Sequence, residues 1–79
     1  MTHEDVWQAI DDFANDMDLS CSGLARCGGL DPTAFNKSKR WNRTGQPRWP
    51  STQSISKILK ATDKKIEDFI QYLPRGKNI

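Results

Sequence analysis

The stretch SCSGLARCGGLDPTAFNKSKR, residues 20–40, carries the strongest local signals for structure in this chain. Ser20 is suited to cap a helix over residues 21–27, because its hydroxyl can accept one of the unpaired N–H groups of the first turn. Gly28 and Gly29 are suited to end that helix, since glycine adopts the left-handed conformation after a helix without a steric penalty. The sequence therefore predicts a short capped helix followed by a tight turn.

A second helix is predicted directly after this turn, over residues 32–40. Asp31 is a good N-cap, and Pro32 is favoured at the first helical position because its missing N–H costs nothing there. The inward side of this helix would carry the apolar residues Leu30, Ala34 and Phe35. The outward side would carry Thr33, Asn36, Lys37 and Arg40, and it contains no acid.

Two helices joined by a glycine turn, with a polar and basic outer face on the second, are the parts of a helix-turn-helix. Ala25 is placed where the two helices would cross, Gly29 at the corner, and Phe35 where the second helix would enter the core. Leu24-Ala25, Gly29-Leu30 and Phe35 at these offsets resemble the lambda-repressor-like (Cro/phage-repressor type) helix-turn-helix family. A generic helical hairpin with no role in nucleic-acid binding is the alternative interpretation.

The resemblance covers roughly residues 6–73 and is to the N-terminal domain of phage-repressor-type bacterial regulators. It implies a compact five-helix all-α domain that binds double-stranded DNA specifically and regulates transcription, as a phage-type repressor. The recognition helix would be residues 32–40, lying in the major groove. The expected base-reading residues are Thr33, Asn36, Lys37 and Arg40.

Each of these side chains has a chemistry suited to a base edge. Asn36 can pair with adenine, Lys37 or Arg40 with guanine, and Thr33 can touch a thymine methyl group or a phosphate. For Asn36 and Lys37 the alternative is solvated surface, and for Arg40 it is a phosphate contact.

Phosphate contacts are expected beside this helix. The N-terminus of the preceding helix, at Ser20, Cys21 and Ser22, would present free N–H groups and a favourable dipole to a phosphate. Lys39 leans toward the flank of the second helix, where it would contact the DNA backbone or remain in solvent.

The residues that follow, WNRTGQPRWP (41–50), predict a loop because their glycine and prolines forbid a continuous helix. This loop is longer than the connection usual in the resembling family. We expect Arg43 and Arg48 to contact phosphates, and an arm that places Arg43 in the minor groove is an alternative. Possible helpers in these contacts are Asn42, Thr44 and Gln46. Trp41 and Trp49 are expected to pin the loop to the domain, with base stacking as the alternative.

The segment before the motif, residues 3–18, predicts an amphipathic helix. Its apolar stripe consists of Val6, Ile10, Phe13, Ala14 and Met17. Thr2 and Asp5 are placed to form a capping box at its start, and Trp7 lies at the margin of the stripe. Aspartates fill the opposite side, which we expect to face away from DNA.

Two further helices are predicted after the loop. One begins at Ser51 or Thr52 and ends near residues 61–63, and the last covers about residues 65–72. The predicted core consists of Ile10, Phe13, Leu24, Ala25, Leu30, Phe35, Ile55, Leu59, Ile66 and Phe69.

The charges of this 79-residue chain, with a net charge of +2, are sorted along the sequence. Residues 1–18 carry six acids and no Lys or Arg, whereas residues 19–50 carry six Lys or Arg against one Asp. Such sorting predicts one face that repels polyanions and one that attracts them. The alternative is that helix surfaces simply carry charge, which explains the number of charges better than their order.

Composition argues against several other classes of protein. Cys21 and Cys27 point in different directions on a helix, so they are expected to be reduced, in a cytoplasmic, nucleoid-associated protein. With His3 as the one further soft ligand, no structural metal site is expected. We find no phosphate-cradling glycine loop and no paired catalytic groups, so neither an enzyme nor a cofactor is expected.

One such domain contacts too little DNA for tight specific binding, so a homodimer on a pseudo-palindromic operator is expected. The candidate dimer surface lies around Ile70, Tyr72 and Leu73, because the last helix often serves this purpose in the resembling family. The domain is predicted over residues 1–73, with 74–79 as a tail or the start of a linker in a longer protein. The alternative function is a protein–protein interaction module on the same fold, without specific DNA binding.

Overall fold

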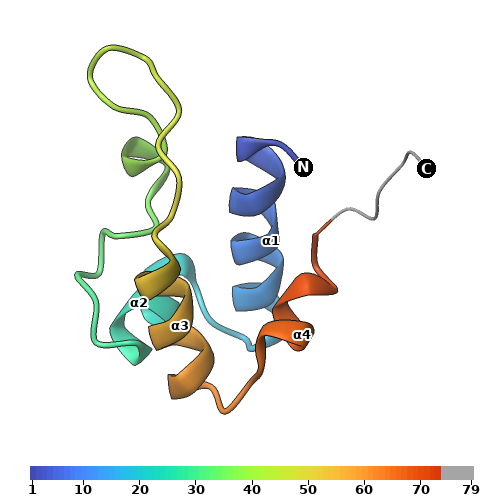
Figure 1. Cartoon of the computed structure of the whole chain (residues 1–79). Coiled ribbons are helices and arrows are strands. Elements are labelled where there is room, and N and C mark those ends of the chain that lie inside the picture. Colours follow the sequence, from blue (N-terminus) through green and yellow to red (C-terminus); the bar gives the residue numbers. More distant parts are fainter. Residues whose placement is uncertain (74–79) are drawn as a thin grey trace.

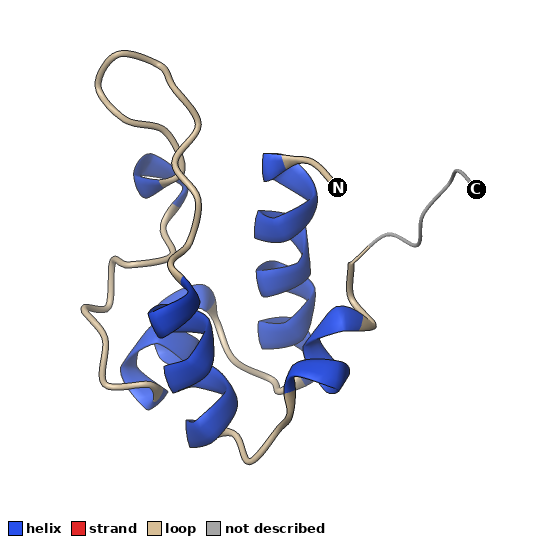
Figure 2. Ribbon diagram, in the orientation of Figure 1, coloured by secondary structure: helices blue, strands red, loops and turns tan. Residues whose placement is uncertain are grey.

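The structure, a computed structural model, describes residues 1–73 and is built from helices joined by loops (Figure 1). The elements are α1 (His3–Asp16), α2 (Cys21–Cys27), the 3-10 helix η1 (Lys37–Lys39), α3 (Thr52–Ala61) and α4 (Ile66–Ile70). The described residues contain one isolated bridge between Trp41 and Pro47 but no β-strand (Figure 2). The radius of gyration, 12.3 Å, is close to the roughly 12 Å expected of a compact domain of this length. The predicted all-α class is confirmed, and the predicted tail, residues 74–79, lies outside the described residues.

Helix α1 begins with the predicted capping box. Thr2 Oγ1 accepts from the backbone N–H of Asp5 at 3.1 Å, and Asp5 Oδ2 accepts from the N–H of Thr2 at 2.8 Å. These reciprocal bonds satisfy two donors that a helix start otherwise leaves unpaired. The apolar stripe of α1 faces the domain interior, and it includes Trp7, which is only 4% exposed. The sequence pattern had indicated a marginal position for this tryptophan.

Helix α2 and the turn after it form as predicted. Ser20 Oγ accepts from the N–H of Gly23 at 3.0 Å, and the helix ends at Cys27. Gly29 has φ +72°, a conformation that favours glycine, and the N–H of Leu30 donates to the carbonyl of Ala25 at 2.9 Å. These features are typical of a helix C-terminus that reverses the chain through a left-handed residue.

The predicted α-helix over residues 32–40 is not present, and this corrects the expected five-helix architecture. Residues 32–35 form turns, Asn36 is extended with ψ 151°, and only Lys37–Lys39 are helical, as the 3-10 helix η1. The backbone bonds run from residue i to i−3, as in Asn36 N–H to the Thr33 carbonyl at 3.0 Å. The side chain of Asp31 also accepts from both the N–H and the hydroxyl of Thr33. Asp31 thus bonds the N–H of Thr33 as an N-cap would, but the chain does not continue as an α-helix.

Helices α1, α2 and α3 enclose the core, and α4 closes it from one end (Figure 1). The fully buried large side chains are Phe13, Phe35, Ile10, Leu24 and Ile58. Of the ten predicted core residues, seven are buried, and Leu30 and Ile55 are half-buried against them. Ile66 is 50% exposed, so its placement in the core was wrong. Helix α4 has only five residues, and Phe69 is the residue that it buries, packed against Phe13.

Candidate nucleic-acid interface

The four predicted base-reading residues do not form one ridge, because residues 32–40 are not a regular helix. Asn36 and Lys37 are exposed and line a hollow of about 350 Å³ together with Ser20 and Cys21. Thr33 is also exposed, but it lines a different hollow of about 280 Å³. The structure therefore brings Asn36 and Lys37 to the N-terminus of α2, whereas Thr33, whose carbonyl accepts from the N–H of Asn36, lines a separate hollow.

Arg40 turns inward rather than toward solvent. Its Nη1 and Nη2 donate to the two carboxylate oxygens of Asp11 at 3.0 and 2.7 Å, and Nη2 also donates to the carbonyl of Phe35 at 3.0 Å. The guanidinium carbon lies 4.8 Å from the centre of the Trp7 ring, and only 11% of the side chain is exposed. In this conformation the guanidinium is not available to a base edge, so Arg40 is a structural residue that holds the segment onto α1.

Asp11 is the centre of a partly buried polar cluster with Arg40 and Cys21. Burial raises the pKa of Asp11, but hydrogen bonds from Arg40 and Cys21, with the charge of Arg40, outweigh it and lower that pKa below its ordinary 3.8. The Cys21 thiol donates to Asp11 Oδ1 at 2.9 Å, and burial together with that carboxylate raises the pKa of Cys21 to about 11. The cluster is therefore a charged Asp–Arg pair with a protonated thiol, and Asp11 packs against residues of the motif rather than lying with the exposed aspartates of α1.

The residues after Arg40 form a loop that projects from the body of the domain (Figure 1). We call residues 41–47 the projecting loop. Asn42 organises it, since its Oδ1 accepts from Thr44 N at 3.2 Å, Thr44 Oγ1 at 2.8 Å and Gln46 N at 3.0 Å. Gly45 makes the turn with φ +84°, a backbone conformation that side chains other than glycine rarely adopt. Asn42, Thr44 and Gln46, the predicted helpers, thus bond one another within the loop.

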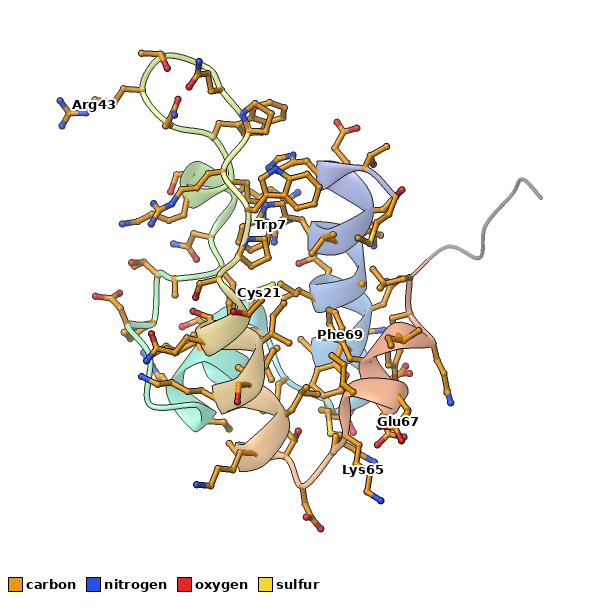
Figure 3. All side chains as sticks on the ribbon, viewed as in Figure 1. Trp7, Cys21, Arg43, Lys65, Glu67 and Phe69 are labelled. Atoms are coloured by element: carbon orange, nitrogen blue, oxygen red, sulfur yellow. The ribbon has the colours of Figure 1, made fainter. Side chains whose placement is uncertain are left out.

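Arg43 lies in this loop, one residue after Asn42. Its side chain points away from the domain (Figure 3), and the structure records no partner for it among residues 1–73. Every residue of the loop is exposed to solvent. Arg43 is thus presented to the surroundings by a hydrogen-bonded loop.

The base of the projecting loop is clasped by α1. His3 Nε2 lies 2.7 Å from the carbonyl of Arg40, and since carbonyl oxygens only accept, Nε2 donates there. Trp7 Nε1 donates to the carbonyl of Arg48 at 2.9 Å, and the N–H of Arg48 donates to the carbonyl of Arg40 at 2.9 Å. The two ends of the loop are therefore joined to each other and to one face of α1.

Two tryptophans flank this clasp. The ring of Trp41 lies 4.7 Å and that of Trp49 5.8 Å from the ring of His3, centre to centre, in edge-to-face arrangements. Both indoles remain about half exposed, at 46% and 50%. These contacts are those expected of residues that pin the loop to the domain, and they leave one part of each ring open to solvent.

The predicted phosphate contacts lie on several elements. Ser20, Cys21 and Ser22 form the start of α2, where Ser20 is exposed. Lys39 and Arg48 are exposed and line the same hollow as Thr33. Between Asp31 and Asp63 the sequence contains seven Lys or Arg and no acid, so the whole segment that carries these residues has one sign of charge.

Sequence reasoning missed the residues that position this surface. His3 was considered only as a metal ligand, and Asp11 only as part of an exposed acidic face. Their partners are the Arg40 carbonyl and guanidinium, 37 and 29 residues away in sequence. Their one visible signal was their spacing with Trp7, since residues 3, 7 and 11 recur every four positions and share one face of a helix.

Other side chains bear on the remaining predictions. Within residues 1–73 no group of three or more His, Cys, Asp or Glu could hold a metal ion. No helix in that same range is long and apolar enough to cross a membrane. Tyr72 is half-buried against Phe13, and its hydroxyl donates to Asp16 at 2.6 Å, whereas Ile70 is 52% exposed. Of the candidate dimer surface, Ile70 is thus the residue most open to a partner.

No family model, curated protein or solved structure matches this chain.

Proposed function

We propose that the chain is a DNA-binding domain that recognises specific double-stranded sequences and regulates transcription, as its resemblance to phage-type repressors implies. The observation that carries the proposal is the placement of Asn36 and Lys37. They are exposed and line one hollow with the N-terminus of α2, and the one acid of that hollow, Asp11, is paired with Arg40. The amide of Asn36 and the amine of Lys37 can hydrogen-bond base edges. The N-terminus of α2 beside them can bind a phosphate.

In this proposal Asn36 and Lys37 contact base edges, and Thr33 contacts either a thymine methyl group or a phosphate. Phosphates are bound around them by Ser20, Cys21 and Ser22 at the start of α2, by Lys39 and by Arg48. Arg40 does not touch DNA. It holds the 3-10 helix against α1 through Asp11, so that Asn36 and Lys37 face outward.

Readout from a 3-10 helix and its flanking turns differs from readout by a continuous recognition helix. A 3-10 helix of three residues presents fewer side chains to a groove than a nine-residue α-helix would. We therefore propose a small number of base contacts per domain, with much of the affinity from phosphates. A pseudo-palindromic operator bound by two copies would double that number.

The apolar strip formed by Ile55, Ile66 and Ile70 is the surface we propose for pairing two copies of the chain. Ile55 and Ile66 line a groove of about 410 Å³ between α3 and α4, and Ile66 and Ile70 are 50% and 52% exposed. In a two-fold dimer the same surface patch of each subunit contacts its copy on the other, so the apolar strips of the two subunits would bury each other.

The same groove favours a second candidate function, docking of a partner protein without specific DNA binding. Leu59 lines it with Ile55 and Ile66, and Lys60 and Lys64 border it. An apolar groove with a basic edge suits an amphipathic helix that carries acidic residues.

A selection on random duplex DNA with the purified chain tests the proposal. Enrichment of a defined motif, bound with an affinity that falls steeply with salt, is the expected result. Each phosphate contact should contribute a slope of about −0.9 in log K against log[salt]. Recovery of no motif, together with salt-insensitive binding to a protein, would support the docking function instead.

A further inference from the structure

We infer that the projecting loop, residues 41–47, is a minor-groove probe that inserts Arg43 beside A·T base pairs flanking the site read by Asn36 and Lys37. This inference rests on the proposed DNA-binding function and adds a second point of readout to it. Of the two contacts expected for Arg43, a phosphate and the minor groove, it favours the second.

The first argument is that the loop is held in one shape. Asn42 Oδ1 accepts three hydrogen bonds within it, and the N–H of Asn42 donates to the carbonyl of Gln46 at 2.9 Å. The clasp of His3 and Trp7 then holds both ends of the loop against α1. A charged side chain on a preorganised loop loses less conformational entropy on binding than one on a free arm.

The second argument is that Arg43 is the one cationic side chain of the loop, whereas the polar side chains of the loop bond one another. The side-chain oxygens of Asn42 and Gln46 and the hydroxyl of Thr44 bond within the loop. Arg43 is the one charged residue between Trp41 and Pro47, and it points outward from the loop (Figure 3). A single long cationic side chain suits the narrow minor groove, where the base edges present hydrogen-bond acceptors.

The third argument concerns charge. Arg43 lies six residues after Lys37, on a loop that projects from the body of the domain (Figure 1). Narrow minor grooves at A·T runs have an enhanced negative potential that attracts arginine. The guanidinium is also more weakly hydrated than an ammonium group, so Arg enters such a groove at lower cost than Lys.

The test uses the motif recovered from the DNA selection, flanked on both sides by A·T, G·C or inosine·C pairs. Inosine·C presents the major groove of G·C but lacks the amino group that G·C places in the minor groove. The unmodified chain should bind A·T and inosine·C flanks roughly fivefold to tenfold more tightly than G·C flanks. Arg43→Ala should bind all three flanks equally, at the level of the G·C duplex, and Arg43→Lys should lose most of the preference while keeping the charge.

The outcomes separate this inference from the function on which it rests. If no motif is recovered from the selection, the proposed DNA-binding function fails, and the minor-groove role fails with it. If a motif is recovered but inosine·C behaves like G·C, the minor-groove role alone is overturned. The same holds if Arg43→Ala weakens all three flanks by one factor, which is the result for a phosphate contact. Thermal denaturation of both variants should match the unmodified chain, because Arg43 has no partner within the described domain.

Discussion

Arg40 and Asp11 form a two-pronged ion pair, with guanidinium nitrogens 3.0 and 2.7 Å from the two carboxylate oxygens, although 29 residues separate them in sequence. The pair joins α1 to the end of η1, and the same guanidinium bonds the carbonyl of Phe35. The ion pair thereby fixes the position of the motif, residues 20–40, relative to α1, which lies outside the motif.

Removing one member of this pair should destabilise the domain. Arg40→Ala leaves a partly buried carboxylate and the Phe35 carbonyl without their partner, and we expect it to lower the free energy of unfolding by about 3 kcal/mol. Urea denaturation followed by circular dichroism measures this quantity. The matched control is Lys39→Ala, an exposed neighbour, which should change it by less than about 0.5 kcal/mol. Equal effects of the two substitutions would contradict the structural role of Arg40.

The ion pair also predicts how stability depends on pH. The pKa of Asp11 is lower in the folded chain than its ordinary value of 3.8. A carboxylate with a lowered pKa stabilises the fold fully above its unfolded pKa, and it loses this contribution as pH falls through the folded value. The unfolding free energy should therefore drop below about pH 4. Asp11→Asn should be less stable near pH 7 and show a smaller drop in acid. Parallel profiles for the two proteins would refute this.

The contacts of Trp7 at the base of the projecting loop predict faster local opening of the loop in addition to a modest loss of global stability. Trp7→Phe keeps an aromatic ring in the core but removes the N–H that donates to the carbonyl of Arg48. We expect a loss of about 1 kcal/mol in stability, and faster hydrogen exchange at the N–H of Arg48, which bonds the Arg40 carbonyl. At core amides such as Leu24, hydrogen exchange should accelerate only by the factor that the loss of global stability accounts for. Unchanged exchange at Arg48 would show that the loop is held by other contacts.

The proposed base and phosphate contacts should differ in sequence dependence. Asn36→Ala should relax the preference at one position of the recovered motif, by about 1–3 kcal/mol of discrimination. Arg48→Ala should weaken binding to all sequences alike and reduce the salt slope by about one contact. Binding titrations on the motif and its single-base variants at several salt concentrations measure both. A uniform loss for Asn36→Ala would assign it to the DNA backbone.

If two copies pair through the apolar strip, a single charged substitution in it should weaken the dimer. Ile70→Glu places a charge on an exposed apolar position of α4, so it should shift a dimer toward monomer with little loss of helix content. Gln71→Glu, at the adjacent exposed position, introduces the same charge and is the control. Sedimentation equilibrium measures the association constant. If both variants associate as the unmodified chain does, the strip is not the dimer surface.

Local signals in the sequence were sufficient for most of the helices. Ser20 and Ser51 cap α2 and α3, the capping box of Thr2 and Asp5 begins α1, and Gly29 reverses the chain. Each of these depends on residues within a few positions of one another, so the sequence alone determines them. Predicted core residues of the helices, such as Ile10, Phe13 and Leu24, are buried for the related reason that apolar periodicity marks a helix face.

The conformation of residues 32–40 and the direction of Arg40 were decided by the tertiary structure. Locally, Asp31 and Pro32 are good helix starters, but burial of Phe35 and the long-range bonds from Arg40 to Asp11 hold the segment as turns and a 3-10 helix. His3 and Trp7 likewise meet the loop only because α1 packs beside it. Sequence thus determined where helices begin and end, since caps and turns are local. Tertiary packing decided which polar groups face solvent, because contacts between residues tens of positions apart outweigh the small free-energy preferences of single residues for a helix.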